Sequence, residues 1–495
     1  MNGSVINRIV AAAPRDGHRI TFQRLDGSST MTLTQLHDNA CRLARGLRAL
    51  GIKAGDRIGI LASNGPEWVL LDLAALRLKA VTAGFEPGKF GSAQALADRY
   101  RLALLFTDRP ADGRKIRQAT AVADLIRDGG PPVPVPEYGP RDVTTIKFTS
   151  GSTGEPKGLA ATAGSIDSSI NAVQEMFGHG DGDSLFLFLP LSLLQQRYWI
   201  YSALCFGHDV TVSTYEAAFP ALRRARPTVV MGVPAFYETA KRHIEARTHA
   251  DSKAAARELF GDRIRYLWTG SAPARPSMLR FFTEAGLPIY EGYGLNETCI
   301  VAKNHPGAHR EGSVGQVLPG KKVLFDADGL ISVHSEHPVN TRYEYAAPGE
   351  SERVFAPDGT VRTGDIGHLD DDGFLFIHGR ADDVIVLDNG RNVLVRPLEE
   401  YLKADPAIQE CVVLCPERSR LVAVVSPAAD PPDTTAITAR VTAANAVFPQ
   451  DERIGGLVVA AEPFSTGNGM LTSQYKPRRR RIAESYLNHW KAVGT

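Results

Sequence analysis

The sequence lacks an excess of charge of either sign. Its 495 residues carry 56 Lys and Arg against 55 Asp and Glu, a formal net charge of +1. Proteins that bind nucleic acid through its phosphates present a clearly basic surface, and anionic membranes attract surfaces of the same kind. The composition therefore gives no support to a nucleic-acid partner or to an acidic membrane surface.

Long apolar runs and cysteines are also scarce. The best apolar candidate, residues 185–194, is about half of the ~20 residues that cross a bilayer and contains Pro190, so no membrane span is expected. The first residues, MNGSVINRIVAAAP, lack the apolar core of a signal peptide. Five scattered cysteines are too few for a disulfide framework. We therefore expect a cytoplasmic protein with reduced thiols.

Helices and strands alternate through the first part of the chain. The length favours more than one domain, because single cores rarely exceed about 250–300 residues. Thr32 to Gly51 has apolar residues at helical spacing and ends on glycine. A strand-like segment at 55–62 and a helical one at 68–80 follow. This alternation predicts parallel sheets with crossover helices, up to about Gly294.

The pattern changes twice further along. From about Gly312, short strands and turns indicate a small β-rich region. After Asp382 a helix at 397–404 and strands at 411–415 and 420–426 are expected, followed by a basic tail. The sequence therefore predicts an α/β protein. A large N-terminal domain of β/α sub-domains with the β-rich region occupies residues 1–381, and a small, mobile α+β C-terminal domain occupies 382–495.

The strongest local motif is TSGSTGEPKG at 149–158, directly after a strand-like segment. Small residues let backbone N–H groups approach a phosphate chain, the hydroxyls add donors, and Lys157 adds positive charge. It is not a Walker loop, which needs glycine directly before the lysine, where Pro156 stands. Its plain alternative is a Gly/Ser-rich surface turn.

Four further motifs follow in order along the chain. Together with the first motif they resemble the motif set of a known superfamily. They are EGYGLNET at 291–298, RTGD at 362–365, GRADD at 379–383 and NGMLTSQYKPR at 468–478. The set resembles the superfamily of acyl-CoA synthetases, luciferases and non-ribosomal peptide adenylation domains. It is most similar to the long-chain acyl-CoA synthetase branch, and the similarity covers nearly the whole chain.

The resemblance implies a nucleotide site made from several segments of the N-terminal domain. Asp365 would accept the ribose hydroxyls, with Arg380 supporting the same sugar, and Tyr293 would face the adenine. Taken alone, Asp365 would be read as a turn residue. The full implied set is Thr149, Ser150, Gly151, Ser152, Thr153, Gly154, Gly270, Ser271, Ala272, Gly292, Tyr293, Gly294, Asn296, Asp365 and Arg380.

Three residues are implied as catalytic. A carboxylate that attacks the α-phosphate of ATP meets another anion, so the site must supply positive charge and a metal. Lys476 would bridge carboxylate and α-phosphate, Lys157 would hold phosphate, and Glu297 would bind Mg²⁺. Asp382 would be the hinge of the C-terminal domain. The plain alternatives are a solvated basic tail around Lys476 and a solvent-facing Glu297.

The implied activity is acyl-CoA ligation in two steps, with ATP, CoA and Mg²⁺ as cofactors. The substrate is expected to be a bulky or apolar carboxylic acid, and an acyl carrier protein is a second acceptor to consider. Association into a homodimer is left open. Candidate walls of the acyl pocket, each of which fits a plain core as well, are Leu193, Tyr198, Trp199, Val233 and Trp268.

Departures from the family pattern keep other functions open. Leu193 stands where the branch has histidine, Gln196 where it has glutamate, and Asn296 where it has threonine. One alternative is a ligase with a decayed adenylation step that makes only the thioester from a pre-formed acyl-adenylate. Others are an acyl-AMP ligase that loads a carrier protein and a nucleotide-binding pseudo-enzyme.

Overall fold

The computed structural model describes residues 3–87, 90, 92–149, 156–247, 251–389, 391–417, 419–471, 477–487 and 491–492, with the backbone alone at 149, 491 and 492. The chain forms two compact units. The first comprises Met1–Leu324, Ser332–Thr363 and Asp371–Leu375, and the second comprises Phe325–Ile331, Gly364–Asp370 and Phe376–Thr495. The domain boundary between 381 and 382 stays a prediction.

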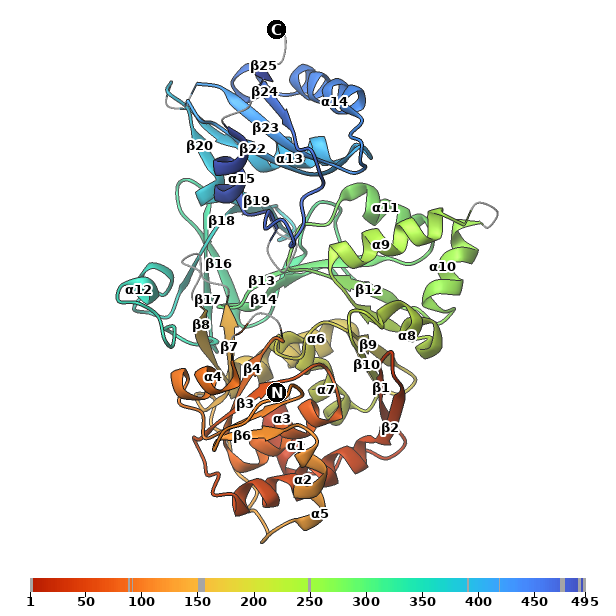
Figure 1. Ribbon diagram of the computed structural model, residues 1–495, viewed down its shortest axis with the longest axis vertical. Helices are drawn as coiled ribbons and strands as arrows, with labels where there is room; N and C mark the ends of the chain where they lie inside the picture. Colours follow the sequence, from red (N-terminus) through yellow and green to blue (C-terminus); the bar gives the residue numbers. More distant parts are fainter. Residues whose placement is uncertain are drawn as a thin grey trace. The chain divides into compact units, whose positions relative to one another are not determined.

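Two sheets build most of the first unit, and parallel pairs dominate both, as the β/α alternation predicts (Figure 1). The smaller sheet has the order β6 (Ile116–Gln118), β5 (Leu104–Thr107), β3 (Arg57–Leu61), β4 (Val81–Phe85), β7 (Val143–Thr149) and β8 (Lys157–Thr162). The larger has the order β15 (Gln316–Val317), β14 (Cys299–Lys303), β13 (Ile289–Leu295), β12 (Tyr266–Thr269), β11 (Val229–Met231), β9 (Ser184–Leu187), β10 (Asp209–Ser213), β1 (Arg19–Gln23) and β2 (Ser28–Thr32).

Helices cover both faces of these sheets. Side chains alternate along a strand, so Leu185 and Leu187 enter one core while Phe186 enters another. The first core joins both sheets to α1 (Val5–Ala11), α2 (Leu33–Ala49), α3 (Pro66–Leu78), α6 (Ala163–Phe177) and α7 (Leu194–Phe206). The second packs the larger sheet against α8 (Ala218–Ala225), α9 (Pro234–Glu245), α10 (Ser252–Phe260) and α11 (Pro276–Glu284). Two shorter helices, α4 (Ala93–Arg99) and α5 (Ala121–Asp128), flank the smaller sheet.

The predicted helix at Thr32 is confirmed. Thr32 caps α2 in a capping box with Gln35, in which each side chain bonds the other residue's backbone N–H. The helix then buries one apolar face and ends before Gly51. In the part of the chain that the structure describes, no helix is both long enough and apolar enough to cross a bilayer.

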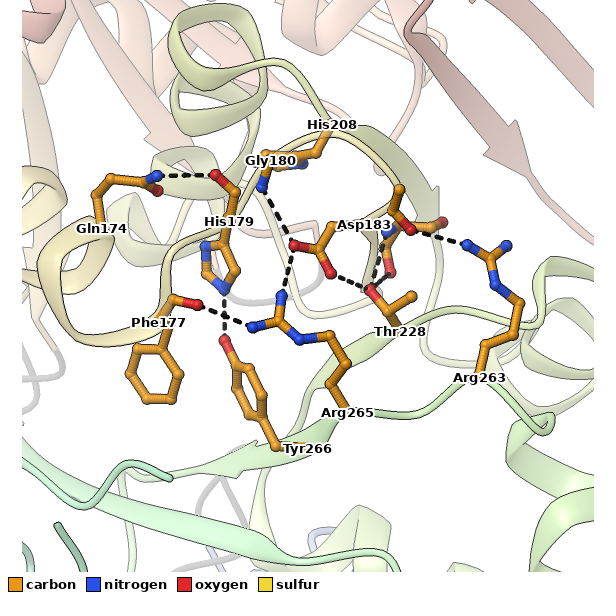
Figure 2. A network of polar contacts seen from close by, with 12 residues as sticks. Gln174, Phe177, His179, Gly180, Asp183, His208, Thr228, Arg263, Arg265 and Tyr266 are labelled. Carbon is orange, nitrogen blue, oxygen red and sulfur yellow. Dashed lines mark hydrogen bonds and ion pairs between the residues drawn. The ribbon is translucent and has the colours of Figure 1, made fainter. Parts of the chain in front are cut away.

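A partly buried polar network fastens the loop after α6 to the larger sheet (Figure 2). Arg265 pairs with Asp183 at 2.6 Å, and Thr228 donates to the same carboxylate at 2.9 Å. His179 Nε2 shares a hydrogen bond with the Tyr266 hydroxyl. Burial lowers the pKa of His179 to about 3, so this ring is neutral in the folded protein.

The remaining elements are short strands followed by an α+β region, as predicted. A four-stranded sheet has the order β16 (Lys321–Phe325), β17 (Leu330–Ser335), β18 (Val361–Leu369) and β19 (Leu375–Arg380). The helix α12 (Glu350–Val354) lies between β17 and β18 in the chain. A hairpin of β20 (Val384–Val386) and β21 (Asn392–Leu394) precedes α13 (Val395–Lys403) and a sheet of β22 (Ile408–Leu414), β23 (Leu421–Pro427), β24 (Ile454–Val459) and β25 (Lys491–Ala492).

The last sheet has a core on each face. One holds α13 and α14 (Thr434–Val447), and the other holds Ile482 of α15 (Arg479–Tyr486). The expected basic tail is therefore in part a packed helix. Arg479 is bound to Glu399 at 2.8 Å and to Asp383 at 3.3 Å, so it is not simply a solvated cation.

Candidate functional site

The phosphate-loop motif lies between two paired strands. β7 leads into it and β8 leaves it, and the two are antiparallel, with Thr149 opposite Lys157. Ser150, Gly151, Ser152, Thr153 and Gly154 lie outside the described residues, and of Thr149 only the backbone is described. The strand pairing holds the two ends of the loop together, which is the arrangement a phosphate cradle needs.

Lys157 points toward a carboxylate and an aromatic ring. Its ammonium lies 2.8 Å from Glu350 Oε1, and both side chains are 14% exposed. The same ammonium lies 5.3 Å from the centroid of the Tyr343 ring. The hydrogen bond from Lys157 lowers the pKa of the Glu350 carboxyl, so this carboxyl is ionised at neutral pH. A lysine held in this way has a defined position beside the loop.

Glu297 joins the same group of side chains. The Tyr343 hydroxyl donates to Glu297 Oε1 at 2.6 Å. Burial and the charge of Glu297 raise the pKa of Tyr343, so the phenol remains a neutral donor. We call Lys157, Glu297, Tyr343 and Glu350 the lysine–carboxylate cluster. It brings the predicted phosphate lysine and the predicted metal ligand together from segments far apart in the sequence.

The turn that carries Glu297 is fixed by its neighbours. It joins β13 to β14, and the buried Thr298 hydroxyl accepts a hydrogen bond from the Leu295 N–H at 3.0 Å. Asn296 is exposed in the same turn. A carboxylate oxygen on a rigid turn is a ligand that Mg²⁺ accepts, so the donor chemistry of Glu297 fits the predicted metal.

Small residues predicted at the adenine lie on adjacent strand ends. Gly270 follows β12, and a Cβ there would stand 3.2 Å from the carbonyl oxygen of Gly292 on β13. Ser271 has a positive φ of 70°, and Ala272 is exposed beside it. At Gly294 a Cβ would stand 2.0 Å from the Cys299 carbonyl oxygen, so only glycine fits. Tyr293, between these glycines, is partly exposed.

Asp365 and Arg380 form a pair in the second unit. Arg380 Nη1 lies 3.2 Å from Asp365 Oδ1, and Asp365 is 7% exposed. Arg380 also lies 3.9 Å from the exposed Asp382, in the short 3₁₀ turn at Ala381–Asp383. Gly364 has a positive φ of 73°, and a Cβ there would meet the Arg380 guanidinium at 2.8 Å. The two residues predicted at the ribose therefore lie together, although their contact with a sugar stays a prediction.

The candidate walls of the acyl pocket are divided between two cores. Tyr198, Trp199 and Trp268 are buried in the first core, where the two indoles pack edge to face at 4.9 Å. Val233 is partly buried against the second core, and Leu193 is the partly buried residue before α7. Of the predicted catalytic residues, Lys476 lies outside the described residues.

The segment LPLSLLQQR at 189–197, which contains Leu193 and Gln196, ends on an arginine that joins two elements of the fold. Arg197 is buried and lies 2.8 Å from Asp72 Oδ1 on α3, and it donates to the Thr145 hydroxyl on β7 at 3.0 Å. Tyr201 also donates to Asp72. This network fixes α7 to the strand that leads into the phosphate loop.

Comparison with known proteins places the chain in a family. The sequence profile of the AMP-binding enzyme family matches residues 9–337, which is well over half of the chain. The chain belongs to the AMP-binding enzyme family. The profile of the AMP-binding enzyme C-terminal domain matches residues 382–490 of the same chain.

Known relatives and solved structures match nearly the whole chain. This AMP-binding enzyme is 27% identical to the long-chain-fatty-acid–CoA ligase FadD15 of Mycobacterium bovis, over 97% of this chain and 95% of the relative. The o-succinylbenzoate CoA synthetase of Bacillus subtilis, solved with its acyl-adenylate, is similar with a TM-score of 0.79 at 20% identity, covering 97% of this chain and 98% of that one. ATP-bound MatB of Rhodopseudomonas palustris gives a TM-score of 0.80 at 21% identity, covering 98% and 99%. At these identities the two structures show the shared α/β fold alone.

Sequence reasoning missed the partners of Lys157 and Glu297 in this AMP-binding enzyme. Tyr343 and Glu350 lie in the segment between β17 and β18, where none of the five motifs falls. Their types, a phenol and a carboxylate, are common on any surface, so only the distances 2.6 Å and 2.8 Å reveal them.

Proposed function

We propose that this chain is an ATP-dependent acyl-CoA ligase that activates a carboxylic acid as an acyl-adenylate and then transfers it to CoA. The observation that carries the proposal is the lysine–carboxylate cluster, in which Lys157 and Glu297 lie in one group at the ends of the phosphate-loop hairpin and the β13–β14 turn. FadD15, at 27% identity over nearly the full chain, is named as a CoA ligase.

The proposed roles follow from charge. Lys157 would bind the phosphates of ATP, and Lys476 would neutralise the charge that develops between the acid and the α-phosphate. Glu297 would hold Mg²⁺, which would offset the negative charge of the phosphates. Asp365 and Arg380 would bind the ribose, and turning at Asp382 would separate adenylation from thioester formation.

Retention of the adenylation step is part of the proposal. The departures at Leu193, Gln196 and Asn296 favour a thioester-only enzyme, since they remove polar groups expected near the α-phosphate. The lysine–carboxylate cluster favours the two-step ligase, because a thioester-only enzyme has no use for a metal ligand and a phosphate lysine held together.

The test is a screen of carboxylic acids with ATP, Mg²⁺ and CoA, read by mass spectrometry for acyl-CoA. The proposal expects acyl-CoA and AMP to form in equal amounts with at least one acid. Acyl-adenylate that accumulates with CoA present, and is consumed only when a carrier protein is added, would favour the carrier-loading alternative. Nucleotide binding with no product from any acid would favour the pseudo-enzyme.

A further inference from the structure

A buried lysine and a partly buried lysine of the first unit lie beside the segment Thr298–Cys299. Lys147, on β7, is 5% exposed, and its ammonium lies 3.7 Å from Cys299 Sγ. Lys321, on β16, is partly buried and donates to the Thr298 carbonyl at 2.7 Å and to the Ser335 hydroxyl at 3.3 Å. The Tyr198 hydroxyl lies 3.0 Å from the same sulfur. We call Lys147, Lys321, Cys299 and Tyr198 the two-lysine site.

The two-lysine site holds positive charge without a matching carboxylate. Among the described residues, no Asp or Glu lies within ion-pair distance of either ammonium; their contacts are a thiol, a hydroxyl and a carbonyl. A buried ammonium is costly unless an anion pairs with it. This arrangement therefore favours binding of an anion from outside the chain.

The location of the two-lysine site indicates which anion it binds. Lys147 is two residues before Thr149, where the phosphate loop begins, and Lys321 holds the carbonyl of Thr298, next to Glu297. In the proposed function, Lys157 and the phosphate loop bind the phosphates of the nucleotide. Tyr198 was one of the expected walls of the acyl pocket, and Cys299 beside it is partly exposed. The remaining anion at this place is a group on the acid.

We propose that Lys147 and Lys321 form an anion subsite for a second acidic group of the substrate, so that the acid activated by this enzyme is a dicarboxylic acid or a similar dianion. This inference rests on the proposed function. It replaces a purely apolar substrate with one that carries a negative charge at both ends. A carboxylate between two ammonium groups makes charge-assisted hydrogen bonds, which are the strong ones.

The first experiment measures binding without turnover. Thermal unfolding is followed with dicarboxylates from glutarate to suberate, with monocarboxylates of equal length, and with inorganic phosphate. We expect at least one dicarboxylate to raise the melting temperature at concentrations where its monocarboxylate does not. Lys147→Met should weaken that binding by about 10–100-fold, whereas Lys322→Met, at the exposed neighbour of Lys321, should leave it unchanged.

Each outcome decides the proposal. Lys147→Met removes a buried charge and keeps an apolar stem, so it should fold at least as well as the parent protein. Cys299→Ser should keep dicarboxylate binding, because the proposal gives the thiol no charge. Loss of binding in Cys299→Ser, an equal effect of phosphate, or equal binding of both acid series would overturn the subsite.

The second experiment separates this inference from the proposed function. Pyrophosphate release is measured with the same acids. A preference for dicarboxylates that falls about 10–100-fold in Lys147→Met, with monocarboxylate turnover unchanged, supports both statements. Dicarboxylate binding that depends on Lys147, without pyrophosphate from any acid, refutes the ligase and keeps the subsite. Turnover of monocarboxylates alone, unchanged in Lys147→Met, refutes the subsite and keeps the ligase.

Discussion

Replacing Tyr343 with phenylalanine removes one hydroxyl and leaves the ring in place. That hydroxyl donates to Glu297 Oε1 at 2.6 Å. The ring packs edge-on against Phe355 at 5.2 Å and lies beneath the Lys157 ammonium at 5.3 Å. Phenylalanine keeps both contacts, so the variant isolates the hydrogen bond to the proposed metal ligand.

The expected loss of metal affinity in Tyr343→Phe can be estimated in two ways. Losing a residue that orients a metal ligand typically costs about 10–100-fold in metal affinity. A hydrogen bond to a charged group contributes about 1.5–3 kcal/mol, and about 1.4 kcal/mol is tenfold, which gives the same range. Since the pKa of Tyr343 is raised, the donor is present at every working pH.

The assay is pyrophosphate release as a function of Mg²⁺ concentration. In Tyr343→Phe, half-saturation should need about 10-fold more Mg²⁺ or above, and the rate at saturating Mg²⁺ should stay within about twofold of the parent. Tyr345→Phe is the matched control, because that hydroxyl contacts Arg57 and the Tyr100 carbonyl instead. An unchanged Mg²⁺ requirement, or equal shifts in both variants, would refute the role given to Tyr343 and Glu297.

Three other predictions test separate parts of the molecule. Lys476→Ala should slow acyl-adenylate formation about 10²–10³-fold while CoA transfer from supplied acyl-adenylate survives; equal loss in both steps would contradict its role. Asp382→Pro fixes the φ angle at the predicted hinge, so one half-reaction should persist and the other fail, and unchanged overall turnover would remove the case for a hinge. Burial lowers the pKa of His179 to about 3 and that of His208 to about 4, against 6.5 in the unfolded chain. The unfolded state therefore binds more protons below pH 6.5, and stability falls as pH decreases: from pH 7 to pH 5 each histidine should cost about 2 kcal/mol. Urea titrations check this loss, which His179→Asn should reduce by about half; an equal slope in that variant would contradict it.

Local patterns in the sequence were enough for most of the fold. The capping box at Thr32 and Gln35 and the alternation of strand and helix depend on neighbouring residues, so they can be recognised without three-dimensional contacts. The basic tail was predicted only in part. The pairing of Arg479 with Glu399 joins residues 80 positions apart, so a local sequence pattern could not predict it.

The candidate site shows the same limit more sharply. Lys157, Glu297 and Asp365 stand in ordered motifs, and the structure gives each a defined partner. Those partners could not be predicted, since Tyr343 and Glu350 belong to no motif. The sequence did not single out Lys147, because a lysine in a strand is usually expected to face solvent. The structure shows instead that Lys147 is only 5% exposed.

A two-step ligase makes an acyl-adenylate before it makes a thioester. The most direct measurement runs the halves separately: pyrophosphate released from acid, ATP and Mg²⁺ without CoA, and acyl-CoA formed from synthetic acyl-adenylate and CoA without ATP. The two-step ligase predicts that both reactions proceed with the same acid, and that the first stops when Mg²⁺ is removed. No pyrophosphate in the first reaction, with acyl-CoA formed in the second, would contradict it.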